Sequence, residues 1–113
     1  PQTTLLCEPD ALLQNLRAMR VLIVDDEPGN VLLLEHTLES HGFSSYLSIT
    51  DSRTALLTCQ AFAPDLILLD WMMPGMHGGQ VIETVRRDYS RDEFLPIVVL
   101  TAAPGVPAAT RSV

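Results

Sequence analysis

The chain has 113 residues, a mass of 12.4 kDa and a formal charge of −7, with seven Arg, no Lys and fourteen acidic residues. Its length suits one compact domain, and its 47% apolar content excludes a mainly disordered chain. The acidic balance argues against binding to nucleic acid or to an anionic membrane, and every apolar run is far too short to span a bilayer.

Residues 1–19 precede the regular pattern and are predicted to form a leader. Pro9 suits the first turn of a helix that would carry Leu12, Leu13 and Leu16 on one face. A linker, a docking helix and part of an upstream element all stay open as interpretations of this segment.

The two cysteines, Cys7 and Cys59, do not have the spacing of a disulfide framework or of a metal site. Cys59 lies in a helical pattern, where it is expected to be a small buried apolar residue. The start of the chain lacks the pattern of a signal peptide. We therefore expect a reducing, cytoplasmic setting.

From residue 20 on, short apolar runs alternate with helical patterns. Val21–Val24 is a continuous apolar run, as expected of a strand that is covered on both faces. Residues 28–41 have apolar side chains at helical spacing, residues 44–50 alternate in the way of an edge strand, and residues 52–63 are again helical.

The second half of the chain continues this alternation. Leu66–Leu69 and Ile97–Leu100 are two further apolar runs. A loop rich in Pro and Gly, residues 74–79, and a helical pattern over residues 81–89 separate them. The order β-α-β-α-β-α-β predicts an α/β fold with a parallel sheet and helices on both faces.

Acidic side chains follow two of the predicted strands. Asp25, Asp26 and Glu27 come directly after the first apolar run, and Asp70 directly after the next long one. A single acid at such a position commonly only caps a helix. If the two strands are adjacent, however, their carboxyl ends meet in one crevice. Crowded carboxylates repel, and Mg²⁺ is a cation that such a cluster of oxygens can hold.

Three segments together resemble the receiver domain of bacterial two-component response regulators. They are residues 21–27 (VLIVDDE), residues 66–78 (LILLDWMMPGMHG) and residues 98–102 (VVLTA). The resemblance implies a flavodoxin-like doubly wound parallel sheet with strand order 2-1-3-4. It also implies a receiver domain over residues 20–113 that is truncated, so that the family's fifth strand and fifth helix are missing.

The resemblance also assigns roles to the acidic residues. Asp70 matches the phosphoacceptor, a carboxylate nucleophile. Asp25 and Asp26 match the carboxylates that hold Mg²⁺ together with Asp70, with Asp26 the more direct ligand and Asp25 acting partly through water. Met72 would contribute its backbone carbonyl to the metal, so its side chain does not affect this role.

The resemblance to the receiver family also concerns two residues near the end of the chain and a lysine that this sequence lacks. Thr101 matches the switch hydroxyl, and the small Ala102 leaves room for the phosphoryl group. The family has a Lys at the end of its fifth strand, and this chain has no Lys. Truncation at Val113 explains that absence better than degeneracy does.

The resulting hypothesis is a phosphorylatable receiver that takes a phosphoryl group from a histidine kinase or a phosphotransfer protein and switches an attached effector. The alternative is a phosphate-independent interaction or dimerisation module. An aspartyl phosphatase, a third class, usually has another Asp two residues after its nucleophile, where Met72 stands here. We also expect self-association of the chain, because the apolar run at Ile97–Leu100 would form an open sheet edge.

Overall fold

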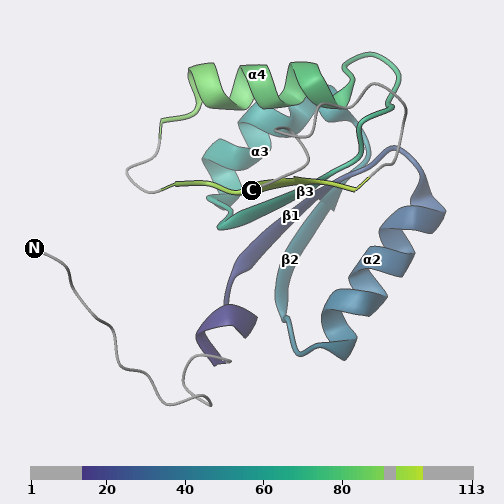
Figure 1. Cartoon of the computed structure of the whole chain (residues 1–113), viewed down its shortest axis with the longest axis vertical. Helices are drawn as coiled ribbons and strands as arrows, with labels where there is room; N and C mark the ends of the chain where they lie inside the picture. The colour runs from purple at the N-terminus through teal and green to yellow at the C-terminus, as the bar shows by residue number, and fades with distance from the viewer. Residues whose placement is uncertain (1–13, 91–93, 101–113) are drawn as a thin grey trace, which may run out of the picture.

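The computed structural model describes residues 14–90 and 94–100 (Figure 1). One parallel sheet holds four strands in the order β2-β1-β3-β4, which confirms the predicted strand order and doubly wound topology. The strands are β1 (Arg20–Val24), β2 (Ser45–Ile49), β3 (Leu66–Leu69) and β4 (Ile97–Val99). The helices are α2 (Pro28–Ser40), the 3₁₀ turn η1 (Ser52–Thr54), α3 (Ala55–Phe62) and α4 (Gly78–Asp88).

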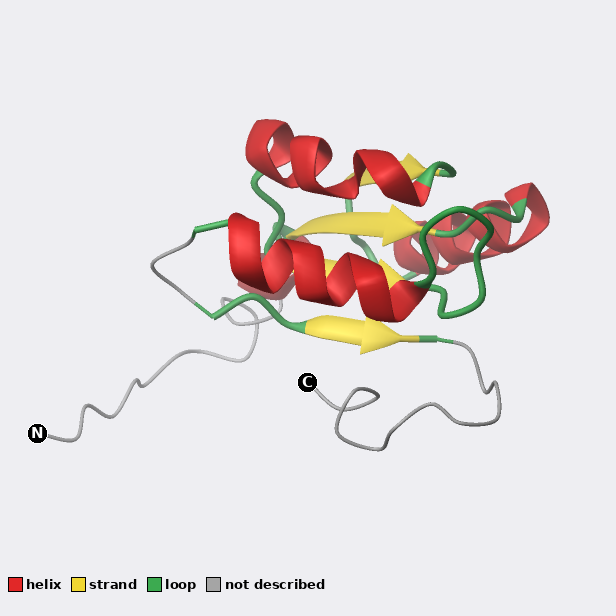
Figure 2. Ribbon diagram, turned by 90° about the horizontal axis from the view of Figure 1, so that it is seen from above, coloured by secondary structure: helices red, strands yellow, loops and turns green. Residues whose placement is uncertain are grey.

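The helices cover both faces of the sheet, as Figures 1 and 2 show. On one face α2 encloses a cluster that contains Val21 and Ile23. On the other face α3 and α4 enclose a larger cluster around Leu22, Val24 and Ile67. Successive residues of β1 therefore point into opposite layers, and residues 21–24 are all buried. This is why the strand reads as a continuous apolar run.

Helix α4 begins at Gly78, earlier than the predicted start near residue 81. Glycines are poor helix formers, so residues 78 and 79 look like loop in the sequence. A capping box provides hydrogen-bond acceptors for backbone N–H groups at the start of α4. His77 Nδ1 accepts a hydrogen bond from the N–H of Gly79, and the Gln80 side chain accepts one from the N–H of His77. The tightly capped start explains the longer helix.

The predicted helix over residues 52–63 is two elements. The carboxylate of Asp51 accepts the N–H of Arg53 and caps η1, and α3 follows from Ala55. Ala55 and Cys59 point into the core as expected, whereas Leu56 is only half-buried. Burial raises the pKa of the Cys59 thiol to about 11, as expected of an apolar site.

Only the end of the leader lies within the described residues. Residues 14–17 are helical and exposed, and the Nε of Arg17 donates to the carbonyl oxygen of His41 at 3.3 Å. Leu12 and Leu13 lie outside the described part of the chain, so the leader's predicted apolar face stays a prediction. Within the part of the chain that the structure describes, no helix is long and apolar enough to cross a membrane.

Candidate metal and phosphoacceptor site

The acids that follow β1 and β3 meet at the carboxyl edge of the sheet. Val24 and Leu69 are partners in the β1–β3 ladder, so Asp25 and Asp70 come next on neighbouring strands. The N–H of Asp70 donates to the carbonyl of Val24 at 2.9 Å, and the N–H of Asp25 donates to that of Ile49 at 3.2 Å. Continuation of the sheet hydrogen bonds thus fixes the backbone of both acids.

Asp25, Asp26 and Asp70 form one cluster. One carboxylate oxygen from each lies within 4.8 Å of the other two. Asp25 is 4% exposed, whereas Asp26 and Asp70 are half-buried. The backbone N–H of Glu27 donates a hydrogen bond to Oδ1 of Asp25 at 2.9 Å. The donors are all hard oxygens, which is the ligand set that Mg²⁺ prefers, and the cluster opens on its Asp26 and Asp70 side.

Burial and like charge act together on Asp70. Desolvation is the largest cause that raises the pKa of its carboxyl, and repulsion from Asp25 and, less strongly, Asp26 raises it further. The backbone N–H groups of Met72 and Trp71 oppose this effect. None of the ion pairs among the described residues includes the three clustered carboxylates. The site is therefore a concentration of negative charge that no ion pair within residues 14–90 and 94–100 neutralises.

The loop after β3 returns tightly against the site. The N–H of Gly78 donates to the carbonyl of Trp71 at 2.7 Å. A Cβ at Gly78 would lie 2.8 Å from Trp71 Cα and 2.9 Å from the carbonyl oxygen of Asp70, closer than real Cβ atoms approach backbone. The lack of a side chain at Gly78 thus lets α4 start directly beside the end of β3.

The structure also shows side chains whose roles sequence reasoning missed. His77 caps α4, and the spacing of His77 and Gln80, which is that of a capping box, was the available signal. Ser52 is 2% exposed and donates to the carbonyl of Met76 in the loop after β3. No local pattern indicates this contact between residues 24 positions apart. Thr101 and Ala102 lie outside the described residues.

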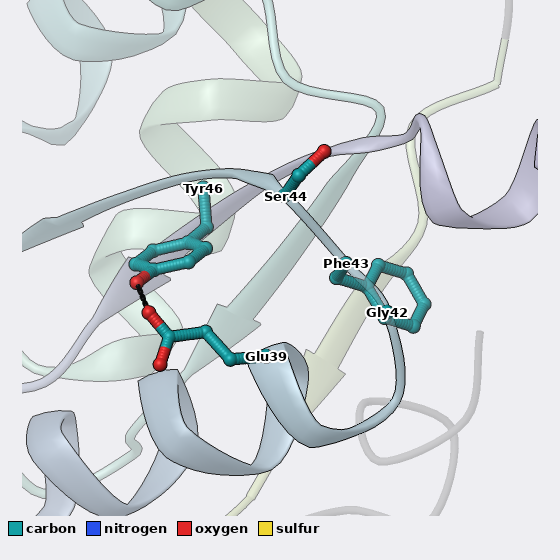
Figure 3. Close-up of a pocket in the computed structure, with 5 residues that line it drawn as sticks. All are labelled: Glu39, Gly42, Phe43, Ser44 and Tyr46. Carbon is teal, nitrogen blue, oxygen red and sulfur yellow. Dashed lines mark hydrogen bonds between the residues drawn. The ribbon is translucent and has the colours of Figure 1, made fainter.

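Two of the surface cavities lined by described residues lie outside the acidic cluster. The larger, about 620 Å³, is lined by residues at the end of α2 and the start of β2, and there the Tyr46 hydroxyl points at the Glu39 carboxylate (Figure 3). This hydrogen bond is the main cause that raises the pKa of Tyr46 to about 12. Because the start of β2 is at the amino edge of the parallel sheet, this cavity is remote from the clustered acids. A second cavity of about 440 Å³ lies between Thr50 and Pro74, in the loops after β2 and β3.

Residues 21–113 match the family model described as the response regulator receiver domain. The chain belongs to this family. The flavodoxin-like fold implied by the resemblance is confirmed by solved receiver structures, among them the N-terminal domain of a response regulator receiver protein from Methanoculleus marisnigri JR1 (TM-score 0.69, 34% identity, 79% of this chain and 71% of that chain).

Other relatives differ in what accompanies the receiver. The chain is 42% identical over 97 residues to the sensor histidine kinase GacS of Pseudomonas protegens, covering 84% of this chain but 10% of that protein. It is 41% identical over 83 residues to the DNA-binding response regulator MtrA of Mycolicibacterium smegmatis, covering 74% of this chain and 34% of that protein. The response regulator protein TrrA of Thermotoga maritima, solved in complex with Mg²⁺-BeF, gives a TM-score of 0.67 at 31% identity, covering 76% of this chain and 71% of that chain.

Proposed function

We propose that this receiver domain accepts a phosphoryl group on Asp70, with Mg²⁺ held by the acidic cluster, and thereby switches an attached effector. The observation that carries the proposal is the convergence of the Asp25, Asp26 and Asp70 carboxylates within 4.8 Å at the carboxyl edge of the sheet. Three uncompensated acids on neighbouring strands are costly unless a cation binds them.

The donor set fits Mg²⁺. Asp26 and Asp70 offer accessible carboxylate oxygens, and Met72 offers a backbone carbonyl on the same loop. Asp25 is nearly buried and has one oxygen engaged by Glu27, which favours an indirect role through water. When bound, Mg²⁺ neutralises the negative charge that the carboxylates and the phosphoryl oxygens bring together. TrrA, a similar receiver, was solved with Mg²⁺-BeF.

Asp70 is the candidate nucleophile because it stands alone after the central strand β3. In the proposed step, a carboxylate oxygen of Asp70 attacks the phosphorus of a phosphohistidine. The new O–P bond forms as the P–N bond breaks, and the imidazole keeps the bonding electron pair and takes up a proton. The N–H groups of Trp71 and Met72 favour the ionised, attacking form of this carboxyl.

The partners follow from the same proposal. The donor would be a histidine kinase or a phosphotransfer protein, and the matched relatives include a sensor kinase and a DNA-binding regulator. Because the chain spans a tenth to a third of those proteins, their outputs are not transferred to it. Thr101 as switch hydroxyl and Ala102 as the small neighbour of the phosphoryl group stay predictions.

The experiment is intact-mass spectrometry after incubation with acetyl phosphate and Mg²⁺. We expect one added phosphoryl group in the wild-type chain and none in Asp70→Asn. Asp51→Asn is the matched control, because Asp51 is an exposed acid in the neighbouring loop whose capping role Asn retains. The control should be phosphorylated like the wild type.

Two results would contradict the proposal. Unchanged phosphoryl uptake in Asp70→Asn would place the acceptor elsewhere. No uptake by a folded wild-type chain at saturating Mg²⁺ would favour the alternative, a phosphate-independent interaction module.

A further inference from the structure

Ser52 is a buried hydroxyl in an otherwise polar, exposed turn. Its neighbours Asp51 and Arg53 are exposed and pair with each other through Nε and Oδ1 at 3.0 Å, whereas Ser52 is 2% exposed. Its hydroxyl donates to the carbonyl oxygen of Met76 at 2.5 Å. Burying a hydroxyl without a hydrogen bond lowers the stability of the fold, so the bond to Met76 offsets the cost of burying Ser52.

The bond joins two loops at the carboxyl edge of the sheet. Ser52 belongs to η1, after β2, and Met76 belongs to the loop between β3 and α4. The capping hydrogen bonds of His77 join this loop to α4, whereas the Ser52 bond joins it to η1. The Arg53 side chain also lies beside this loop, since a Cβ built at Gly75 would be 3.6 Å from Arg53 Cδ.

The tethered loop is the one that carries the phosphoacceptor chemistry. It starts at Asp70, includes the N–H groups of Trp71 and Met72 that act on the Asp70 carboxyl, and closes where Gly78 donates to Trp71 at 2.7 Å. Met76 lies two residues before that closure. Fixing the Met76 carbonyl therefore restricts the return of the loop that also carries Met72.

We propose that Ser52 is a positioning residue of the Mg²⁺ site: through the Met76 carbonyl, its hydroxyl holds the loop after β3 in the geometry that binds the metal. Ser52 is not one of the proposed metal ligands, which are Asp25, Asp26, Asp70 and the Met72 carbonyl. This inference rests on the proposed function for its metal, but the tether itself can be measured without metal.

Ser52→Ala removes the hydroxyl and keeps the Cβ in its buried place. We expect faster amide hydrogen exchange at residues of the loop 71–78 in the metal-free protein, because the loop loses its tether. We also expect weaker Mg²⁺ binding by about three- to tenfold, less than the 10–100-fold typical of groups bonded directly to a ligand. Trp71, the single tryptophan, reports binding by its fluorescence.

Ser48→Ala is the matched control. Ser48 also donates a part-buried hydroxyl hydrogen bond between two elements, to Glu35 at 2.6 Å, but it joins β2 to α2 and does not touch the loop. The control should lose stability in urea to a similar extent and leave the loop exchange and the Mg²⁺ affinity unchanged. Ser52→Thr, which keeps the hydroxyl, should bind Mg²⁺ more tightly than Ser52→Ala.

The outcomes separate this inference from the proposed function. Loop exchange and Mg²⁺ affinity in Ser52→Ala equal to those of the Ser48→Ala control would overturn the inference while the wild type still binds Mg²⁺. If the wild type binds no Mg²⁺, the proposed function fails, and so does the metal role of Ser52, whatever the exchange shows.

Discussion

Asp70 is held at a position where its own charge opposes folding. Burial and the neighbouring Asp25 raise the pKa of its carboxyl above the ordinary value. An acid with a raised pKa in the folded state binds its proton more tightly there than in the unfolded chain. It therefore lowers stability at neutral pH, and the penalty disappears as the pH falls below the unfolded-state pKa.

The first prediction follows from the direction of this pKa shift. Without divalent cations, Asp70→Asn should increase the free energy of unfolding in urea at about pH 7, and the gain should shrink towards about pH 4, where the unfolded-state carboxyl takes up its proton. Asp51→Asn should give no such gain, because Arg53 lowers the pKa of Asp51. A loss of stability in Asp70→Asn at neutral pH would contradict the electrostatic picture.

The second prediction separates the two acids that follow β1. Asp26→Ala should weaken Mg²⁺ binding more than Asp25→Ala, because Asp26 is the more exposed and Asp25 has one oxygen engaged by Glu27. We expect at least about a tenfold rise in the half-saturating concentration for Asp26→Ala, or about 1.4 kcal/mol. Trp71 fluorescence measures both variants. Equal affinity in Asp26→Ala and wild type would refute the assignment.

Single residues show where sequence reasoning succeeds and where it stops. The Asp25, Asp26 and Asp70 cluster was predictable because acids that directly follow adjacent parallel strands must meet at one edge. Ser52 was not predictable, because its burial comes from a loop 24 residues away and its local neighbours are polar. The position of Gly78 was visible in the motif, but the reason for it needed the approach to Trp71.

At the scale of elements, helix α4 depends on how closely its first turn approaches β3. The third prediction is that Gly78→Ala destabilises the fold by about 1–3 kcal/mol, since its Cβ would overlap the backbone of Trp71 and Asp70. Helix propensity alone would favour Ala over Gly. The measurement is urea unfolding, and the control is Gly29→Ala in the first turn of α2, where the nearest atom is a flexible Glu27 oxygen at 3.4 Å.

The urea unfolding of Gly78→Ala could also give the opposite result, which would contradict the prediction. If the variant were as stable as the Gly29→Ala control or more so, helix propensity would dominate and the close approach would be relieved by a small shift of α4. The loop after β3 would then have more freedom than the 2.7 Å bond from Gly78 to Trp71 implies.

The elements themselves were largely predictable because strands and helices carry different apolar periods. The continuous runs that form β1 and β3 are covered by α2 on one side and by α3 and α4 on the other. Boundaries were less predictable. The start of α4 depends on the His77 capping box, and the separate turn η1 depends on the Asp51 cap; both are decided by side-chain hydrogen bonds rather than by apolar pattern.

At the scale of the whole molecule, the sheet has unequal edges. Strand β2 lies at one edge and carries Ser45, Ser48 and Tyr46, whereas β4 lies at the other, within the described residues, and consists of Ile97–Val99. Strand β4 pairs with β3 on one side, and among the described residues no strand pairs with its other side. An apolar edge strand without Lys or Pro has none of the features that deter pairing with another chain.

The last prediction is therefore that the chain self-associates through this edge. Multi-angle light scattering should give a mass above the 12.4 kDa monomer that rises with concentration. Val98→Lys places a charge in the middle of β4 and should shift the equilibrium towards monomer. Leu57→Lys is the control, because Leu57 is 69% exposed on α3 rather than in a strand of the sheet, and it should leave the mass unchanged. A concentration-independent monomer would mean that another segment covers β4, and equal shifts in both variants would point to non-specific association of apolar surface.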